Sequence, residues 1–254
     1  MEDKQLTITL SKTSAHIAEV FRSSQEIVKY KSVDFKSSKP IDVKEELKVF
    51  FDKNEFNDSY YETTLAWSSR NSFFVPSKLL DKSSVSDLYS VVISEKFDRN
   101  DLDYSKLIEL DMACIYEMPM WIKSFFVRLF PTIRIQHENA MLIRSVFQEY
   151  TDKFIIIIAC FEDYFSVNIV ENSKLIFSNN YDFLTIEDIV YHLKHIIDKQ
   201  DLSAKKANVV GFELSKDSKS TLNQVFSILY NKMGLKNYKY NSPSRFIKPH
   251  ILCV

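Results

Sequence analysis

Apolar and polar residues alternate along three segments near the start of the chain. They are residues 6–10 (LTITL), 15–21 (AHIAEVF) and 26–35 (EIVKYKSVDF), and only short polar breaks separate them. Alternation with a period of two predicts strands, and breaks this short predict antiparallel neighbours. The chain is therefore expected to begin with a three-stranded antiparallel arrangement.

A helical pattern follows these strands. Pro40 stands near the start of the segment IDVKEELKVFFDKNEF, whose apolar residues recur at helical spacing. We expect Asp42 together with Glu45 to cap the N-terminus of this helix. Residues 60–67 (YYETTLAW) then predict a further strand, and residues 71–75 (NSFFV) another.

The same order of elements returns later in the chain. Residues 154–160 (FIIIIAC) are an apolar, β-branched run that predicts a buried strand, residues 165–170 alternate, and residues 175–177 begin a third strand. Thr185 is the expected N-cap of the helix IEDIVYHLKHIIDKQ, and residues 208–214 (NVVGFEL) predict the next strand.

A last helix and a short strand complete this second region. Ser220 opens the helix TLNQVFSILYNKM, Gly234 is its expected C-cap, and residues 238–240 predict a short strand. Both regions thus have the order β-β-β-α-β-(α), which indicates an internal repeat of structure. We place the boundary between two domains in the polar segment 151–153 (TDK).

The stretch between the two regions predicts shorter elements. We expect helical turns at 85–94 and 103–107, strands at 110–116 and 132–136, and amphipathic helices at 121–130 and 138–150.

Composition narrows the class of protein. The chain has 254 residues, of which 45% are hydrophobic and 26% charged, as in a soluble globular protein. The formal net charge of -1 gives no electrostatic support for a nucleic-acid partner. The charged start (MEDKQ) and the absence of a long apolar run predict no signal peptide and no transmembrane segment, and hence a cytoplasmic protein. Cys114, Cys160 and Cys253 are far apart and are expected to be reduced thiols.

Glycine is the most informative residue because it is nearly absent. The chain has 2 glycines, Gly211 and Gly234, where average usage would give roughly 18. Loops that cradle phosphate need glycine, since backbone N–H groups must approach the phosphate without a Cβ in the way. The sequence contains neither a GxGxxG motif nor a P-loop.

Two acidic residues and two histidines have spacings that can support chemistry. Glu162 and Asp163 could polarise water or hold a metal, or they could form a solvated hairpin turn. His192 and His195 lie three residues apart on one helix, a spacing that can bind metal, but no Glu or Cys completes the site and we interpret them as part of an exposed polar face. We assign no catalytic residue and no metal ligand.

Other polar and aromatic residues receive structural interpretations. His16 is expected to be a strand residue whose side chain is hydrogen-bonded, and His137 with Glu138 to cap the helix that follows. Aromatic pairs such as Phe125 and Phe126 cannot both point inward from a narrow helix face. Such pairs indicate either protein contact surfaces or burial between domains.

The order of three antiparallel strands, a helix, a parallel strand and another helix resembles the ribonuclease-H-like unit. Two such units in tandem resemble the actin-like ATPase superfamily, which includes actin, sugar and acetate kinases, heat-shock chaperones and the cell-division protein FtsA. The resemblance is carried by residues 6–35, by FFVPSKLL at 73–80, and by 154–183. These segments are similar to an uncharacterised bacterial family with this fold. The resemblance implies an α/β protein with ribonuclease-H-like domains at 1–150 and 151–254.

The superfamily's nucleotide motifs have poor counterparts in this chain. The resemblance implies a first phosphate loop with Asp and Gly, but residues 10–14 (LSKTS) contain neither. It implies a second loop of the type Asp-x-Gly, but residues 160–164 (CFEDY) carry bulky Phe and Tyr there. The Gly-Gly pair of the adenosine motif is reduced to Gly211.

We therefore expect a catalytically inactive actin-like protein, a pseudo-ATPase, that needs no cofactor and acts as a scaffold or as the partner of another protein. An alternative is a divergent ATPase or kinase that holds ATP and magnesium with side chains in place of glycine loops. A third hypothesis is a module that binds a small ligand other than a nucleotide. The cleft candidates for a ligand are Lys12, Glu162, Asp163, Gly211 and Lys216.

Overall fold

In a computed structural model, the chain forms two compact units, each with its own main sheet. The first unit comprises Met1–Arg144 and Ile247–Val254, and the second comprises Ser145–Phe246. The structure describes residues 3–56, 60–80, 84–150, 154–161, 163–200, 207–213, 221–233, 238–240, 244–245 and 247–252.

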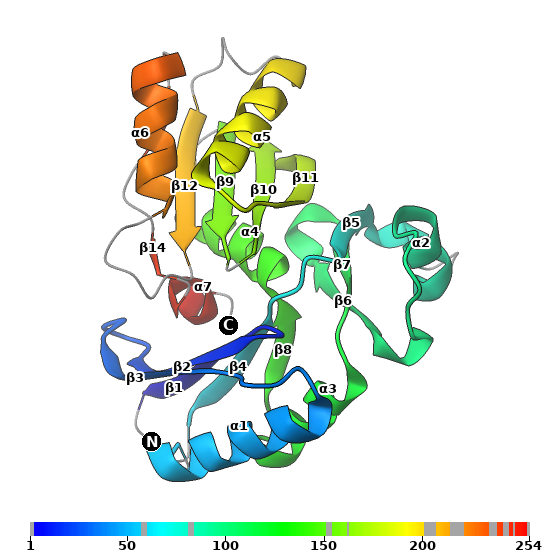
Figure 1. Ribbon diagram of the computed structural model, residues 1–254, viewed down its shortest axis with the longest axis vertical. Helices are drawn as coiled ribbons and strands as arrows, with labels where there is room; N and C mark the ends of the chain where they lie inside the picture. Colours follow the sequence, from blue (N-terminus) through cyan, green and yellow to red (C-terminus); the bar gives the residue numbers. More distant parts are fainter. Residues whose placement is uncertain are drawn as a thin grey trace. The chain divides into compact units, whose positions relative to one another are not determined.

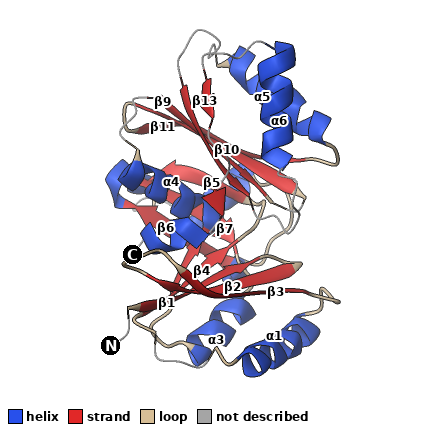
Figure 2. Ribbon diagram, turned by 90° about the vertical axis from the view of Figure 1, so that its left-hand side faces the viewer, coloured by secondary structure: helices blue, strands red, loops and turns tan. Residues whose placement is uncertain are grey.

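The main sheet of the first unit has five strands in the order β3-β2-β1-β4-β8. β1 pairs antiparallel with β2 and parallel with β4, and β4 pairs parallel with β8. Helices α1 and α3 cover one face of this sheet (Figure 2). The elements are β1 (Lys4–Leu10), β2 (Ser14–Phe21), β3 (Ile27–Asp34), α1 (Pro40–Asn54), β4 (Glu62–Trp67), α3 (Met120–Leu129) and β8 (Arg134–His137).

The alternation in β1 explains how this sheet is covered. Leu6, Ile8 and Leu10 are buried, with at most 1% of each exposed, and alternation places them together on one face of the strand. That face is the one α1 and α3 cover, where the ring of Phe51 from α1 lies 6.0 Å from that of Phe126 in α3. The predicted strands and the predicted helix after Pro40 are confirmed.

The N-terminus of α1 differs from expectation. Its N-cap residue is Lys39, which makes no side-chain capping hydrogen bond, and Pro40 is the first helical residue. The carboxylate of Asp42 accepts a hydrogen bond from Ser37 Oγ at 2.7 Å. The expected cap by Asp42 with Glu45 was therefore wrong. Proline at the first helical position already has a helical φ and lacks one of the N–H groups that a helix start leaves unpaired, so it favours a helix start at Pro40.

A smaller three-stranded sheet, in the order β5-β7-β6, also belongs to the first unit. The prediction of helical turns at 103–107 was wrong, because β6 pairs antiparallel with β7 from Leu102↔Glu117 to Leu107↔Met112. Pairing with the next strand in a hairpin overrides a weak local preference. The elements here are β5 (Ser72–Pro76), η1 (Ser77–Leu79), α2 (Val85–Val92), η2 (Arg99–Asp101), β6 (Leu102–Leu107), η3 (Ile108–Leu110), β7 (Met112–Glu117) and, after β8, α4 (Glu138–Glu149).

The C-terminal helix α7 (Ile247–Leu252) belongs to the first unit, although it follows the second unit in the chain. It lies on the side of the main sheet opposite α1 (Figure 1). Ile251 packs there against Ala18 and Val20 of β2. This helix was not predicted from the sequence.

The second unit has a sheet in the order β11-β10-β9-β12-β13, with β14 also paired to β12. Helices α5 and α6 lie side by side on one of its faces (Figures 1 and 2). The predicted boundary at 151–153 and the C-cap Gly234 lie outside the described residues. The elements are β9 (Phe154–Cys160), β10 (Tyr164–Glu171), β11 (Lys174–Asp182), α5 (Ile186–Lys199), β12 (Ala207–Glu213), α6 (Thr221–Met233), β13 (Tyr238–Tyr240) and β14 (Ser244–Arg245).

The two units repeat the order that the sequence predicts. β1, β2, β3, α1 and β4 of the first unit correspond to β9, β10, β11, α5 and β12 of the second. The expected cap of α5 is also confirmed: Asp188 N donates to Thr185 Oγ1 at 3.3 Å, and Thr185 N donates to the Asp188 carboxylate at 2.8 Å. This reciprocal pair is a capping box.

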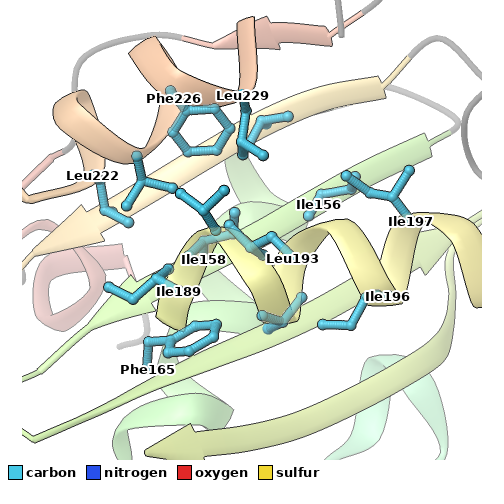
Figure 3. Close-up of a cluster of buried hydrophobic side chains, with 14 of the residues drawn as sticks. Ile156, Ile158, Phe165, Ile189, Leu193, Ile196, Ile197, Leu222, Phe226 and Leu229 are labelled. Carbon is cyan, nitrogen blue, oxygen red and sulfur yellow. The ribbon is translucent and has the colours of Figure 1, made fainter. Parts of the chain in front are cut away.

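The core of the second unit lies between its sheet and helices α5 and α6. Figure 3 shows Ile156 and Ile158 of β9 facing Leu193 of α5 and Phe226 of α6, all of them buried. A void of about 20 Å³ remains among these side chains, and every residue that lines it is apolar. Because it offers no hydrogen-bond partner, a void of this size stays dry.

Leu193→Ala should strongly destabilise the second unit. Leu193 is 3% exposed and borders the void, so truncation enlarges an existing cavity and should cost about 2–5 kcal/mol of unfolding free energy. Tyr191→Ala on the same helix is the control, because Tyr191 is 66% exposed and should change stability by at most about 0.5 kcal/mol. Urea unfolding followed by circular dichroism measures both, and equal effects of the two substitutions would contradict this packing.

Candidate functional site

The carboxyl ends of β1, β4 and β8 define the candidate site of the first unit. These strands run parallel and in register, with Leu10 beside Trp67 and Trp67 beside His137. In open α/β sheets, ligands bind beyond the carboxyl ends of parallel strands. We call this region the carboxyl edge of the first unit; it consists of residues 11–14, 68–69 and 137–139.

The hairpin between β1 and β2 is closed by one serine side chain. Ser11 Oγ accepts hydrogen bonds from the backbone N–H of Thr13 at 3.1 Å and of Ser14 at 2.9 Å. Ser11 N in turn donates to Ser14 O at 2.9 Å. The candidate residue Lys12 is exposed between them. Two amides of this turn are thus directed at a side chain of the protein itself.

His137 ends β8 and is completely buried at the carboxyl edge. Its Nδ1 accepts a hydrogen bond from Asn139 N at 3.2 Å, so it caps the first turn of α4 as the sequence suggested. Since Nδ1 is an acceptor, the proton of the neutral ring is on Nε2, which donates to Ser69 O at 3.0 Å. Burial lowers the pKa of His137 to about 3.

Ser69, His137 and Glu138 are close together, but they do not form a catalytic triad. Ser69 Oγ and Glu138 Oε2 each lie 3.4 Å from the same atom, His137 Nε2. A triad needs the serine on one ring nitrogen and the carboxylate on the other, with the serine-facing nitrogen free to accept a proton. Nε2 already carries the proton here, and His137 and Glu138 are both 0% exposed. The cluster can hold α4 against the sheet but cannot activate Ser69.

A second buried histidine holds α7 on the sheet. His250 Nε2 lies 3.0 Å from Thr9 Oγ1, and His250 Nδ1 lies 2.8 Å from Thr64 Oγ1. Gln5 Nε2 donates to the backbone oxygen of His250 at 3.0 Å. Burial lowers the pKa of this imidazole to about 3. Sequence reasoning missed this network; its one signal was the polar alternation of Gln5, Thr7 and Thr9 along β1.

In the second unit, the hairpin between β9 and β10 takes the place of the β1–β2 hairpin. The rings of Phe161 and Tyr164 stack with centroids 4.6 Å apart and planes at 16°, and both side chains are buried. Phe161 N donates to Tyr164 O at 2.9 Å, which closes the turn. Asp163 is exposed at this turn, and Glu162 lies outside the described residues.

The remaining ligand candidates, Gly211 and Lys216, belong to β12 and to the segment after it. Gly211 lies inside the strand, paired with Ile158 of β9, and not in a loop. Glu213 ends the strand, and its Oε1 accepts a hydrogen bond from Thr221 N at 2.6 Å at the start of α6. A carboxylate of the protein is therefore placed at this helix N-terminus, where negative charge is stabilised. Lys216 lies outside the described residues.

Among the described residues, the histidine pair on α5 and the cysteines Cys114 and Cys160 are not arranged as metal ligands, and Cys253 lies outside the described residues. The ring of His192 packs against that of Tyr181 at 4.6 Å, and His195 is exposed. Among the residues that the structure describes, no group of three or more His, Cys, Asp or Glu is arranged to hold a metal. Cys114 and Cys160 are free and buried, and burial raises the pKa of the Cys160 thiol to about 12.

Comparison with known proteins gives the family. Residues 1–228 match the family described as "Protein of unknown function (DUF3822)". The chain belongs to this family. A search of curated protein sequences found no match. Within the described residues, no helix is both long enough and apolar enough to span a membrane.

Solved structures show the fold. The chain is similar to a Bacteroides thetaiotaomicron protein "with actin-like ATPase fold and unknown function", at a TM-score of 0.76 and 16% identity over 100% of this chain and 96% of that one. It is also similar to the PilM–PilN type IV pilus biogenesis complex, with TM-score 0.55, 12% identity, and 98% and 90% coverage. A third similarity is to the ethanolamine utilization protein EutJ from Carboxydothermus hydrogenoformans, with TM-score 0.52, 9% identity, and 98% and 86% coverage. This DUF3822 protein has the actin-like ATPase fold, with tandem ribonuclease-H-like domains.

Stability should fall as pH drops from about 6.5 towards 3. His137 and His250 have folded-state pKa values of about 3, against 6.5 unperturbed. In this window the unfolded chain binds protons that the folded chain excludes. Each histidine should therefore remove about 1.4 kcal/mol of stability per pH unit.

Urea unfolding between pH 4 and 7 should show this dependence of stability on pH. His250→Gln should make it shallower by about 1.4 kcal/mol per pH unit, the contribution of one histidine. His195→Gln is the matched control, because His195 is exposed and its replacement should leave the slope as in the parent. A His250→Gln slope equal to that of the parent would contradict burial of a neutral imidazole.

Proposed function

We propose that this DUF3822 protein is a catalytically inactive actin-like protein that does not use ATP and acts as a scaffold or partner for other proteins. The observation that carries the proposal is that Ser11 Oγ and the stacked rings of Phe161 and Tyr164 lie in the turns where the resemblance places the phosphate loops. In phosphoryl-transfer proteins, backbone amides, a metal ion and cationic side chains meet the phosphates.

The first support comes from the β1–β2 hairpin. The superfamily resemblance places a phosphate at this turn, where backbone N–H groups would donate to it. Here Ser11 Oγ accepts from Thr13 N and Ser14 N at 3.1 and 2.9 Å. A phosphate would have to displace this hydroxyl and break both bonds before it gained any.

The second support comes from the carboxyl ends of β9 and β12. The stacked rings of Phe161 and Tyr164 fill the turn where the resemblance places the second phosphate loop. Glu213 provides a carboxylate at the N-terminus of α6, which a bound anion would otherwise occupy. An additional phosphate next to that carboxylate would meet repulsion between like charges.

The proposed role as a scaffold or partner is supported by a similar structure that is a complex of two proteins. One similar structure is a complex of PilM with PilN in type IV pilus biogenesis. There the fold is seen bound to another protein, and this chain would act in the same general way on a partner of its own.

Calorimetric titration with ATP and magnesium, with a phosphate-release assay, tests the proposal. We expect neither binding nor turnover at millimolar ATP, because the backbone N–H groups of Thr13 and Ser14 already donate to Ser11 Oγ. A characterised actin-like ATPase in the same buffer is the positive control. A dissociation constant in the low micromolar range that Lys12→Ala abolishes would overturn the proposal in favour of a divergent ATPase or kinase. A thermal-shift screen of metabolites without phosphate tests the third hypothesis, a small-ligand module.

A further inference from the structure

Tyr89 of α2 carries a buried hydroxyl group that has no hydrogen-bond partner. The residue is 0% exposed, and its Oη makes no hydrogen bond to any of the described residues. Its ring is held by the rings of Phe73 in β5 and of Phe97, whose centroids lie 5.9 and 4.9 Å away. A buried polar atom without a partner costs stability, and in native proteins it can mark the place of a water or an ion.

The small sheet of the first unit, against which α2 lies (Figure 1), brings polar side chains together at one of its ends. The β5–β7 ladder ends at Ser72↔Tyr116, so Asn71 and Glu117 come next at the same end. Leu102 of β6 pairs with Glu117 and packs in the same apolar cluster as the tyrosine ring. Because paired residues of an antiparallel ladder share a face, the Glu117 carboxylate lies on the face that the ring covers.

A second carboxylate reaches this place from the segment after α2. Asn71 Nδ2 donates to Glu95 Oε2 at 3.3 Å, so the remaining polar atom of the amide is the acceptor Oδ1. Burial raises the pKa of Tyr89, and the carboxylates of Glu117 and Glu95 raise it further. Both charges that act on the hydroxyl are therefore negative. We call Asn71, Tyr89, Glu95 and Glu117 the small-sheet cluster.

The negative charge of this cluster is not neutralised by basic side chains. In the described part of the chain, neither Glu95 nor Glu117 forms an ion pair. The basic residues next to the cluster in the sequence are Arg70, Lys96 and Arg99, and all three are exposed. Glu95 is exposed as well, so a small cation can reach the cluster from solvent on that side.

We propose that the small-sheet cluster is a binding site for a hard divalent cation, and that calcium fits it best. All four side chains offer oxygen, and none offers sulfur or imidazole, which softer metals prefer. Calcium accepts carboxylate and amide oxygens in a flexible geometry, with waters completing its shell. An organic ammonium ion would need space for its carbon chain beside Tyr89 Oη, which is buried. The site goes beyond the proposed function and does not depend on it.

Calcium titration of the full chain, first stripped with EDTA, tests the proposal. Calorimetry should show saturable binding with a dissociation constant on the order of 0.1–1 mM, because only two carboxylates contribute charge. Terbium, which takes the place of calcium and emits when a neighbouring tyrosine absorbs light, should give a luminescence signal that added calcium removes.

Two variants locate the binding at the small-sheet cluster, with calcium calorimetry as the readout. Glu117→Gln removes one of the two charges and should weaken binding at least tenfold. Tyr89→Phe should weaken it at least threefold, yet in EDTA its melting temperature should be at least that of the parent, because the hydroxyl it removes has no partner. The matched controls are Glu45→Gln and Tyr104→Phe, which alter exposed residues elsewhere in the first unit and should leave binding unchanged.

Three outcomes would overturn the inference. The first is no saturable binding up to about 10 mM calcium, which would leave the hydroxyl to a buried water. The second is unchanged affinity in Tyr89→Phe, which decides the matter even if Glu117→Gln fails to fold. The third is an equal loss in Glu45→Gln, which would show attraction by net charge alone. The calcium titrations contain no nucleotide, so their failure is distinguishable from failure of the proposed function.

Discussion

The first unit depends on one property of β1: both faces of this strand are buried, but one face is apolar and the other is polar. One face of the strand is aliphatic and packs under α1 and α3, and the other carries Gln5, Thr7 and Thr9. A polar face buried in a sheet must be hydrogen-bonded, because an unsatisfied group costs about 1–3 kcal/mol. His250 from α7 meets part of that requirement, since its Nε2 lies beside Thr9 Oγ1 and its backbone oxygen accepts from Gln5 Nε2, while Thr7 Oγ1 donates to Ala18 O within the sheet. The position of the C-terminal helix thus follows from polar residues within the first ten of the sequence.

Within each unit, turns and helix starts beyond the carboxyl ends of the strands are closed by the chain's own side chains. Ser11 closes the β1–β2 hairpin of the first unit, and in the second unit Phe161 and Tyr164 stack at the β9–β10 hairpin while Glu213 caps α6. Neither hairpin contains a glycine.

Local patterns predicted most of the elements and the repeat, because strands such as β9 and helices such as α5 carry strong periodicities. The prediction failed where the local pattern is weak or where distant residues meet. β6 was taken for a helical turn, although it forms a hairpin with the next strand, β7. Similarly, the capping role of His137 was visible beside a helix start, but its bond to Ser69 joins residues 68 positions apart. The hydrogen bonds of His250 could not be predicted for the same reason, since its partners are Gln5, Thr9 and Thr64, far away in the sequence.

The place of α7 has a consequence for how the protein is made. Gln5 and His250 are 245 residues apart and meet in the same buried network. A ribosome adds about 5–20 residues per second, so β1 emerges many seconds before its last partner exists. The hydrogen bonds of Gln5 and Thr9 to His250 can form only after residues 247–252 have left the exit tunnel. This face of the sheet is therefore completed by a helix that is made long after the strand it covers.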